Sequence, residues 1–241
     1  MRPLLLVLSL LLISSSAQAT AGDARASFAL GKARLEQGDE VGAREAFLLS
    51  TEAAPTWLLP WLELGELAVR RREGIGEARQ ALAALEASGA RNPRYHRILG
   101  DLAELAGEDE AAVAAWGASL ARLPEQDDVR LRMASALERL ERHEEAAQAY
   151  ARLLARNPAD LIVRARHAHA LEAAGAYEAA REELETLVKL QPGKEIPLRR
   201  LARFLERRGE VERARRIHAE ADRVGQRPPP RKMRPLPPSI R

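Results

Sequence analysis

Apolar and small residues recur along this chain at the spacing of amphipathic helices, and the stretch Leu99–Pro124 shows the pattern most clearly. A turn at Gly107 divides this stretch into two short amphipathic segments. Gly100 and Ala112 are small enough for two helices to approach closely, and Trp116 is large enough to fill the space beside them. The stretch therefore predicts two antiparallel helices joined by a tight turn and ended by a proline.

The same pattern returns about every 34 residues. The close-approach position of the first helix is small in six successive units: Gly31, Gly65, Gly100, Ala134, Ala168 and Ala202. The matching position of the second helix is always alanine: Ala43, Ala78, Ala112, Ala146, Ala180 and Ala214. The first-helix positions are separated by 34, 35, 34, 34 and 34 residues. Independent helices have no reason to keep such a period, so the spacing predicts an array of repeated helix pairs.

These residues resemble the tetratricopeptide repeat family, which has Leu-Gly in the first helix, Ala and an aromatic residue in the second, and a closing proline. Trp61, Leu64 and Gly65 match the first-helix motif of that family. The resemblance covers about residues 24–225 and implies an all-α fold, a right-handed α-solenoid of about six antiparallel helix pairs. It also implies a non-catalytic scaffold that binds a protein or peptide in a concave groove lined mainly by first helices.

Three domains are predicted on this basis: a signal peptide at 1–19, the array at 20–225, and a basic, Pro-rich flexible tail at 226–241. The units of the array are about 24–57, 58–92, 93–126, 127–160, 161–194 and 195–225. Three departures from the repeat are notable. The second unit has an extra residue between Gly74 and Gly76, which predicts a local kink, and the fourth has Glu141 in place of a turn glycine. In the sixth unit His218 replaces a large apolar residue in a highly charged helix, which we expect to cap the array.

The N-terminus has the features of a secretory signal peptide. An apolar run of about ten residues, Leu4–Ile13, precedes the A-x-A sequence that ends at Ala19. We expect cleavage before Thr20 and export of the chain, most simply to a bacterial periplasm. The alternative is an uncleaved N-terminal anchor, although the run is shorter than the roughly 20 residues of an ordinary membrane span.

Composition and charge exclude several kinds of site and one class of partner. The chain has no cysteine, which excludes disulfides, thiolate metal sites and a cysteine nucleophile. Residues 223–241 contain six basic residues and no acidic one. Taking these six and Arg2 from the 38 basic residues leaves 31, against 35 acidic residues in the body of the chain. Because the folded part is slightly acidic, we expect no nucleic-acid partner.

The predicted groove can be described in rows, since residues at one point of a first helix repeat with the array. One row is acidic in four units: Glu104, Glu138, Glu172 and Glu206. It suits a basic or extended peptide, but a solvated row partly neutralised by Arg139, Arg203 and Arg207 is the favoured interpretation. The full set of candidate partner-binding residues is Phe28, Leu62, Arg97, Asp101, Glu104, Glu138, Glu172, Arg199, Arg203 and Glu206.

No residue pattern predicts catalysis, a metal site or a cofactor. His167 and His169 are two residues apart on a predicted helix and point to different sides. We expect Trp61 and Trp116 to pack in the core, whereas Trp57 packs on the first unit or lies exposed at the rim.

The leading hypothesis is an exported interaction scaffold of the cell envelope. One alternative is an accessory subunit or chaperone-like factor of an envelope assembly system for cytochrome, pilus or outer-membrane biogenesis, which rests on analogy with the family. Another is that the basic tail binds the glutamate row or an anionic membrane or cell-wall surface. The sequence does not indicate an oligomeric state.

Overall fold

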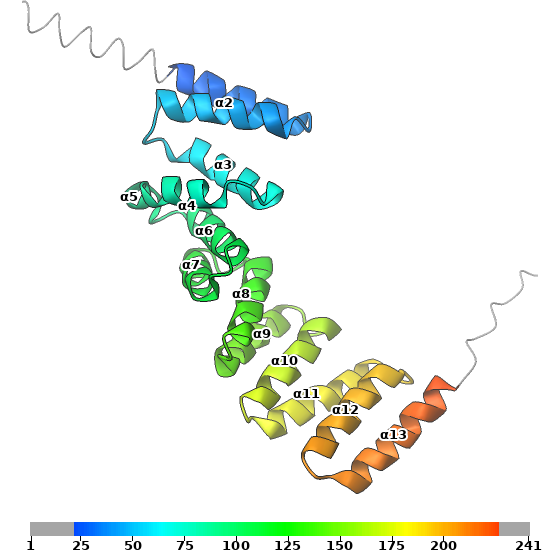
Figure 1. Cartoon of the computed structure of the whole chain (residues 1–241). Helices are drawn as coiled ribbons and strands as arrows, with labels where there is room; N and C mark the ends of the chain where they lie inside the picture. The colour runs from blue at the N-terminus through cyan, green and yellow to red at the C-terminus, as the bar shows by residue number, and fades with distance from the viewer. Residues whose placement is uncertain (1–21, 227–241) are drawn as a thin grey trace, which may run out of the picture. The chain divides into compact units, whose positions relative to one another are not determined.

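The computed structural model describes residues 22–226, and every regular element in that range is a helix (Figure 1). The expected all-α fold is therefore confirmed. The chain divides into two compact units, which comprise residues 22–145 and 146–226 of the described part. None of the described helices has the length and apolar character needed to cross a membrane. The predicted signal peptide and most of the predicted tail lie outside the described residues.

Unit 1 begins with a helix over residues 22–36. The helices that follow in this unit are α2 (Glu40–Ala53), α3 (Leu58–Arg71), α4 (Ile75–Ala83), α5 (Glu86–Gly89), α6 (Pro93–Leu105), α7 (Asp109–Arg122) and α8 (Asp127–Arg139). The division between the units falls within α9 (His143–Arg156). Unit 2 continues with α10 (Leu161–Ala173), α11 (Tyr177–Leu190), α12 (Glu195–Arg207) and α13 (Val211–Gly225). Consecutive helices pack against one another from α2 to α5, from α6 to α8 and from α10 to α13, as the repeat predicts.

The predicted close approach of helices is confirmed in unit 1. A Cβ atom added at Gly100 would lie 2.4 Å from Cδ1 of Trp116, and Trp116 is fully buried. A Cβ atom added at Gly31 would lie 2.4 Å from Cε1 of Phe47. In both pairs the glycine of the first helix provides the space for an aromatic ring of the second helix.

Short polar side chains begin several helices. The Asn92 side chain accepts hydrogen bonds from the backbone N–H groups of Arg94 and Tyr95, and Pro93 occupies the first turn of α6. The Asp160 side chain accepts from the N–H groups of residues 162 and 163 at the start of α10. These caps satisfy backbone donors that have no partner within the helix. Asn92 thus acts as a helix cap.

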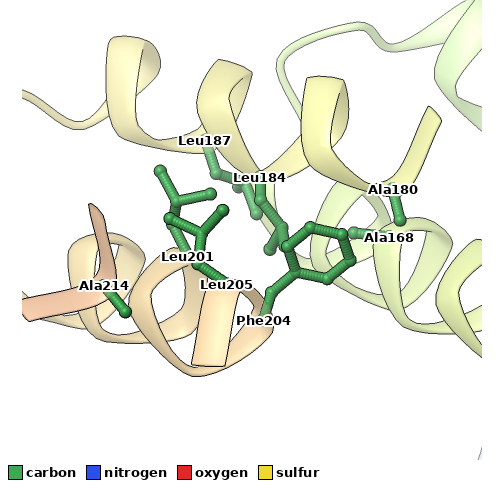
Figure 2. Close-up of a cluster of buried hydrophobic side chains, with 8 residues drawn as sticks. All are labelled: Ala168, Ala180, Leu184, Leu187, Leu201, Phe204, Leu205 and Ala214. Carbon is green, nitrogen blue, oxygen red and sulfur yellow. The ribbon is translucent and has the colours of Figure 1, made fainter. Parts of the chain in front are cut away.

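The core of unit 2 lies between α10, α11, α12 and α13 (Figure 2). Leu184 and Leu187 of α11 face Leu201 and Leu205 of α12, and the Phe204 ring reaches toward Ala168 of α10. Small residues of α10, α11 and α13 close the cluster: Ala168, Ala180 and Ala214. Because α10 and α12 share this core, the two first helices of unit 2 occupy fixed positions relative to each other.

The second repeat departs from the pattern in its second helix as well as in its turn. The helix is interrupted after Ala83, and the short α5 follows. The Tyr95 hydroxyl donates to the Leu82 carbonyl over 3.0 Å, and a Cβ atom at Gly89 would lie 2.4 Å from the Tyr95 ring. Tyr95 thus occupies the space beside the interruption and satisfies a carbonyl close to it.

The turn of the fourth repeat keeps the backbone shape of the others without a glycine. Glu141 has a φ of 57°, in the left-handed region where Gly107 has 77° and Gly175 has 80°. At the other end of unit 2, α13 buries Ala214 and Ala221 and exposes charged residues, as expected of a terminal repeat: Glu212, Arg215, Arg216 and Glu220.

Candidate partner-binding surfaces

The first helices of unit 1 are joined by a chain of ion pairs. Glu63 contacts Lys32 at 3.3 Å and Arg94 at 2.9 Å. Arg94 also contacts Glu66 at 2.8 Å, and Glu66 pairs with Arg97 as well. The chain continues to Asp101, which lies 3.7 Å from Arg97 and 3.0 Å from Arg132. We call these residues the unit 1 ladder: Lys32, Glu63, Glu66, Arg94, Arg97, Asp101 and Arg132.

The acidic residues of the ladder lie deeper than the basic ones. The Glu63 and Asp101 side chains are each 5% exposed. Burial alone raises the pKa of Glu66, but hydrogen bonds and charges from Arg94 and Arg97 outweigh it and lower this pKa below its usual 4.5. Burial raises the pKa of Asp101, despite its contacts with Trp116, Arg132 and Arg97. The basic side chains of the ladder therefore form ion pairs with carboxylates that lie deeper in the protein than they do.

Two of the candidate residues in this unit are buried. Leu62 is fully buried in a cluster with Leu82 and Ile98, and Asp101 is buried against Trp116. Both side chains therefore lie inside the molecule and not on the surface that the sequence suggested. Leu62 packs against Leu82 of its own repeat and Ile98 of the next one, whereas Asp101 is covered by Trp116 in the second helix of its own repeat. Arg97 is half-buried within the ladder.

Phe28 is also engaged in packing. Its ring centroid lies 5.7 Å from that of Phe47 and 5.0 Å from that of Trp57. Trp57, whose position the sequence left open, thus packs on the first repeat.

The four side chains of the glutamate row each have a partner within the protein. Glu104 lies 3.5 Å from Arg139, and Glu138 also has an interaction partner. Both carboxylate oxygens of Glu172 accept hydrogen bonds from Arg207, at 2.7 and 2.8 Å. Glu206 lies 3.1 Å from His218. Two of the four glutamates, Glu104 and Glu172, are thus paired with arginines, and the other two each have a partner within the protein.

Unit 2 exposes a different kind of surface on its two first helices. Side chains at intervals of four, three and four residues lie on one face of a helix. On α10 the exposed side chains at this spacing are Ile162, Arg166, His169 and Ala173. On α12 they are Ile196, Arg200, Arg203 and Arg207, each 34 residues further along the chain. We call these eight residues the unit 2 face.

Two isoleucines mark the beginning of this face on each helix. The exposed fraction is 72% for Ile162 and 68% for Ile196, the two highest values among the exposed large hydrophobic residues of the described part. Single exposed apolar residues are ordinary. Here two exposed isoleucines occupy equivalent positions of adjacent repeats. They form a small periodic apolar surface, and neither side chain contributes to the packing of the core.

Some arginines on and beside the unit 2 face form ion pairs within the protein, and others do not. Arg207 is bound by Glu172, which also ties α12 to α10. Arg199, a candidate residue just beside the face, is bound by Glu195 and by Asp222 at 2.8 Å. Arg200 and Arg203 are exposed and have no hydrogen bond or ion pair within residues 22–226. Their guanidinium groups are therefore available to a ligand.

Sequence reasoning selected Arg203 but missed Ile162, Ile196 and Arg200. The signal that identifies them is the 34-residue repeat applied to the second position of each first helix, where the chain has isoleucine in both repeats of unit 2. As for metals, no group of three or more His, Asp or Glu residues in residues 22–226 is placed to hold an ion. His167 is buried beside Glu183, 3.2 Å from its carboxylate.

Comparisons with known proteins agree with the helix-pair architecture. Two family models described as tetratricopeptide repeat match the chain, one at residues 139–197 and the other at 14–56, 62–128 and 110–160. A comparison with curated proteins found no match.

Several solved structures share the fold. A crystal structure of the MamA protein is 18% identical, with 70% of this chain and 92% of MamA covered at a TM-score of 0.62. MamA from Desulfovibrio magneticus is 17% identical, with 68% and 95% covered at a TM-score of 0.55. YrrB, described as a TPR protein with an unusual peptide-binding site, is 16% identical, with 75% and 93% covered at 0.62. Repeat proteins of this kind are generally non-catalytic interaction scaffolds. Since the family model at 14–160 alone matches more than half of the sequence, the chain belongs to the tetratricopeptide repeat family.

Proposed function

We propose that this protein is a non-catalytic scaffold of the cell envelope that binds a polypeptide partner on the unit 2 face. The observation that supports this proposal is the presence of one exposed isoleucine on each of the adjacent helices α10 and α12, beside two unengaged arginines on α12. Such a surface provides both apolar area and charge for recognition. The peptide-binding site named for YrrB supports a polypeptide as the class of ligand.

Unit 1 is less suited to this role. Its ladder cations already contact carboxylates, two of which are buried. A ligand that drew Arg97 or Arg132 away would leave a buried carboxylate with fewer partners, which costs free energy. Binding at unit 2 requires no such exchange at Arg200 or Arg203.

The envelope location rests on residues 1–19, which lie outside the described residues. Their apolar run and A-x-A sequence are typical of a cleaved signal peptide. N-terminal sequencing of the protein recovered from a cell fraction tests this directly. We expect a mature chain that begins at Thr20. A membrane-bound chain that retains residues 1–19 would favour the anchor, and an intact chain in the cytoplasm would contradict export.

Site-specific photo-crosslinking tests the binding surface. A photoreactive amino acid is placed at Ile162 or at Ile196, and at Arg216 of α13 as the matched control. We expect the first two positions to give the same crosslinked partner, identified by mass spectrometry, and the control position to give none. A partner that crosslinks equally from all three positions, or from none, would contradict the proposed surface.

If the identified partner belongs to a cytochrome, pilus or outer-membrane assembly system, the narrower role of accessory subunit follows. An unrelated envelope partner would leave the scaffold function intact and remove that role.

A further inference from the structure

We infer that the unit 2 face selects an internal acidic segment of its partner, one that presents aliphatic side chains beside its carboxylates. This inference rests on the proposed function and specifies the chemistry of the partner. It follows from which charges on α10 and α12 are already engaged and from the order of residue types along each helix.

The acidic side chains of α10 and α12 each have a hydrogen-bond or ion-pair partner within the protein. Glu172 is bound by Arg207, Glu195 by Arg199, and Glu206 lies beside His218. A ligand that approaches α12 therefore meets the guanidinium groups of Arg200 and Arg203 and no unengaged carboxylate on that helix. A guanidinium group offers five N–H donors in a planar fork that matches the two oxygens of a carboxylate.

Two arginines at this spacing require more than one negative group. Arg200 and Arg203 are three residues apart and neighbours on the helix surface, and each is free to bind a separate carboxylate. A single chain-terminal carboxylate would satisfy only one of them fully. We therefore expect side-chain carboxylates of aspartate and glutamate within the segment, not the end of the partner chain.

The two exposed isoleucines indicate that the partner segment also presents aliphatic side chains. Each lies four residues before a basic residue on its helix, with Ile162 before Arg166 and Ile196 before Arg200. A ligand that covers the face thus passes from apolar contact at Ile196 to cationic contact at Arg200 on α12. On α10, Arg166 already has an interaction partner within the protein, so that helix contributes mainly the apolar contact of Ile162. An acidic segment without aliphatic residues would leave Ile162 and Ile196 exposed, and a nucleic-acid backbone would do the same. The basic tail of this chain has the same charge as Arg200 and Arg203, so it is not the occupant.

Fluorescence anisotropy with defined peptides tests the inference on the full mature chain. The main probe is a short peptide of alternating leucine and aspartate or glutamate, acetylated and amidated so that it has no terminal charge. Three comparison probes replace the acids by lysine, replace leucine by serine, or substitute a short single-stranded DNA. We expect the acidic leucine peptide to bind with a dissociation constant at least about tenfold lower than any other probe, and its binding to weaken with added salt.

Variants identify the surface that binds. The double variant Arg200→Glu, Arg203→Glu should weaken binding of the acidic peptide by more than about tenfold, and Ile162→Ser with Ile196→Ser by about tenfold. The matched controls Arg216→Glu and Val211→Ser change an exposed residue of the same charge or character on α13 and should leave binding unchanged. Circular dichroism establishes that each variant remains folded. Equal loss in variants and controls, or tighter binding of the DNA, would overturn the inference.

The crosslinked partner separates this inference from the proposed function. If that partner binds in solution and the Arg200→Glu, Arg203→Glu variant binds it equally well, the chemistry inferred here is wrong and the scaffold function stands. If the isoleucine positions crosslink to no protein and no peptide binds, the proposed function itself is wrong.

Discussion

The indole Nε1 of Trp116 donates a hydrogen bond of 2.9 Å to Oδ1 of Asp101, and both side chains are buried. This contact joins the two helices of the third repeat, α6 and α7, at the base of the unit 1 ladder. Asp101 is thus shared between a core tryptophan and the surface cations Arg97 and Arg132. The packing of the repeat and the arrangement of charges on unit 1 therefore depend on the same carboxylate.

The substitution Asp101→Ala should lower the free energy of unfolding by about 1–3 kcal/mol, because the buried Trp116 N–H loses its acceptor. Urea denaturation followed by circular dichroism measures this change. The variant Asp101→Asn keeps an acceptor for Trp116 and should cost less than Asp101→Ala. An equal cost for both would show that the ion pairs of Asp101, and not the hydrogen bond to Trp116, account for the effect.

Gly100→Ala should destabilise the protein by about 1–3 kcal/mol, because its Cβ atom would lie 2.4 Å from the Trp116 ring. The matched control is Gly117 on α7, where an added Cβ atom would meet nothing within 4 Å. Gly117→Ala should stabilise the protein by about 0.5–1 kcal/mol through the higher helix propensity of alanine. Thermal or urea unfolding of the two variants should thus show opposite signs, and a stabilising Gly100→Ala would contradict the close packing.

Glu141→Gly should stabilise the protein by roughly 1 kcal/mol, because a residue with a side chain pays a penalty at a φ of 57°. The reverse change in the equivalent turn, Gly107→Glu, should destabilise by a similar amount. Both positions are exposed, so altered packing contributes little. Two changes of the same sign in denaturant unfolding would argue against a common left-handed turn in these repeats.

The stability of the protein should decline as the pH falls below 6.5, in part because of His167. Burial lowers the pKa of His167 from 6.5, the nearby charge of Arg164 also lowers it, and the contact with Glu183 opposes the shift only in part. Below pH 6.5 the unfolded chain therefore takes up a proton that the folded chain resists, and the stability present above that pH is lost.

His167→Gln removes this titration and should reduce the loss of stability on acidification. The original protein, measured in parallel under the same conditions, is the control. Unfolding measured at a series of pH values tests this, and an unchanged profile for His167→Gln would contradict the assignment.

The sequence determined the architecture because the forces that shape each repeat act over short distances along the chain. Gly100 and Trp116 are 16 residues apart, on the two helices of one pair, and the same small and large positions return with the period. A steric relationship of this kind is visible in residue size and spacing alone. The helical fold, the close approach of the paired helices and the charged terminal helix could all be predicted in this way.

Only the tertiary structure decided which surface residues are available to a partner. The ion pairs that matter join helices of neighbouring repeats, such as Arg94 with Glu66, 28 residues away, and Arg207 with Glu172, 35 residues away. The sequence shows Arg97 and Arg203 as basic residues on equivalent helices, but it does not show which carboxylate each guanidinium reaches. Arg97 is bound within the ladder and Arg203 is not, because Glu66 of the preceding first helix and Asp101 of the same helix both reach Arg97, and no acidic side chain of the described residues reaches Arg203.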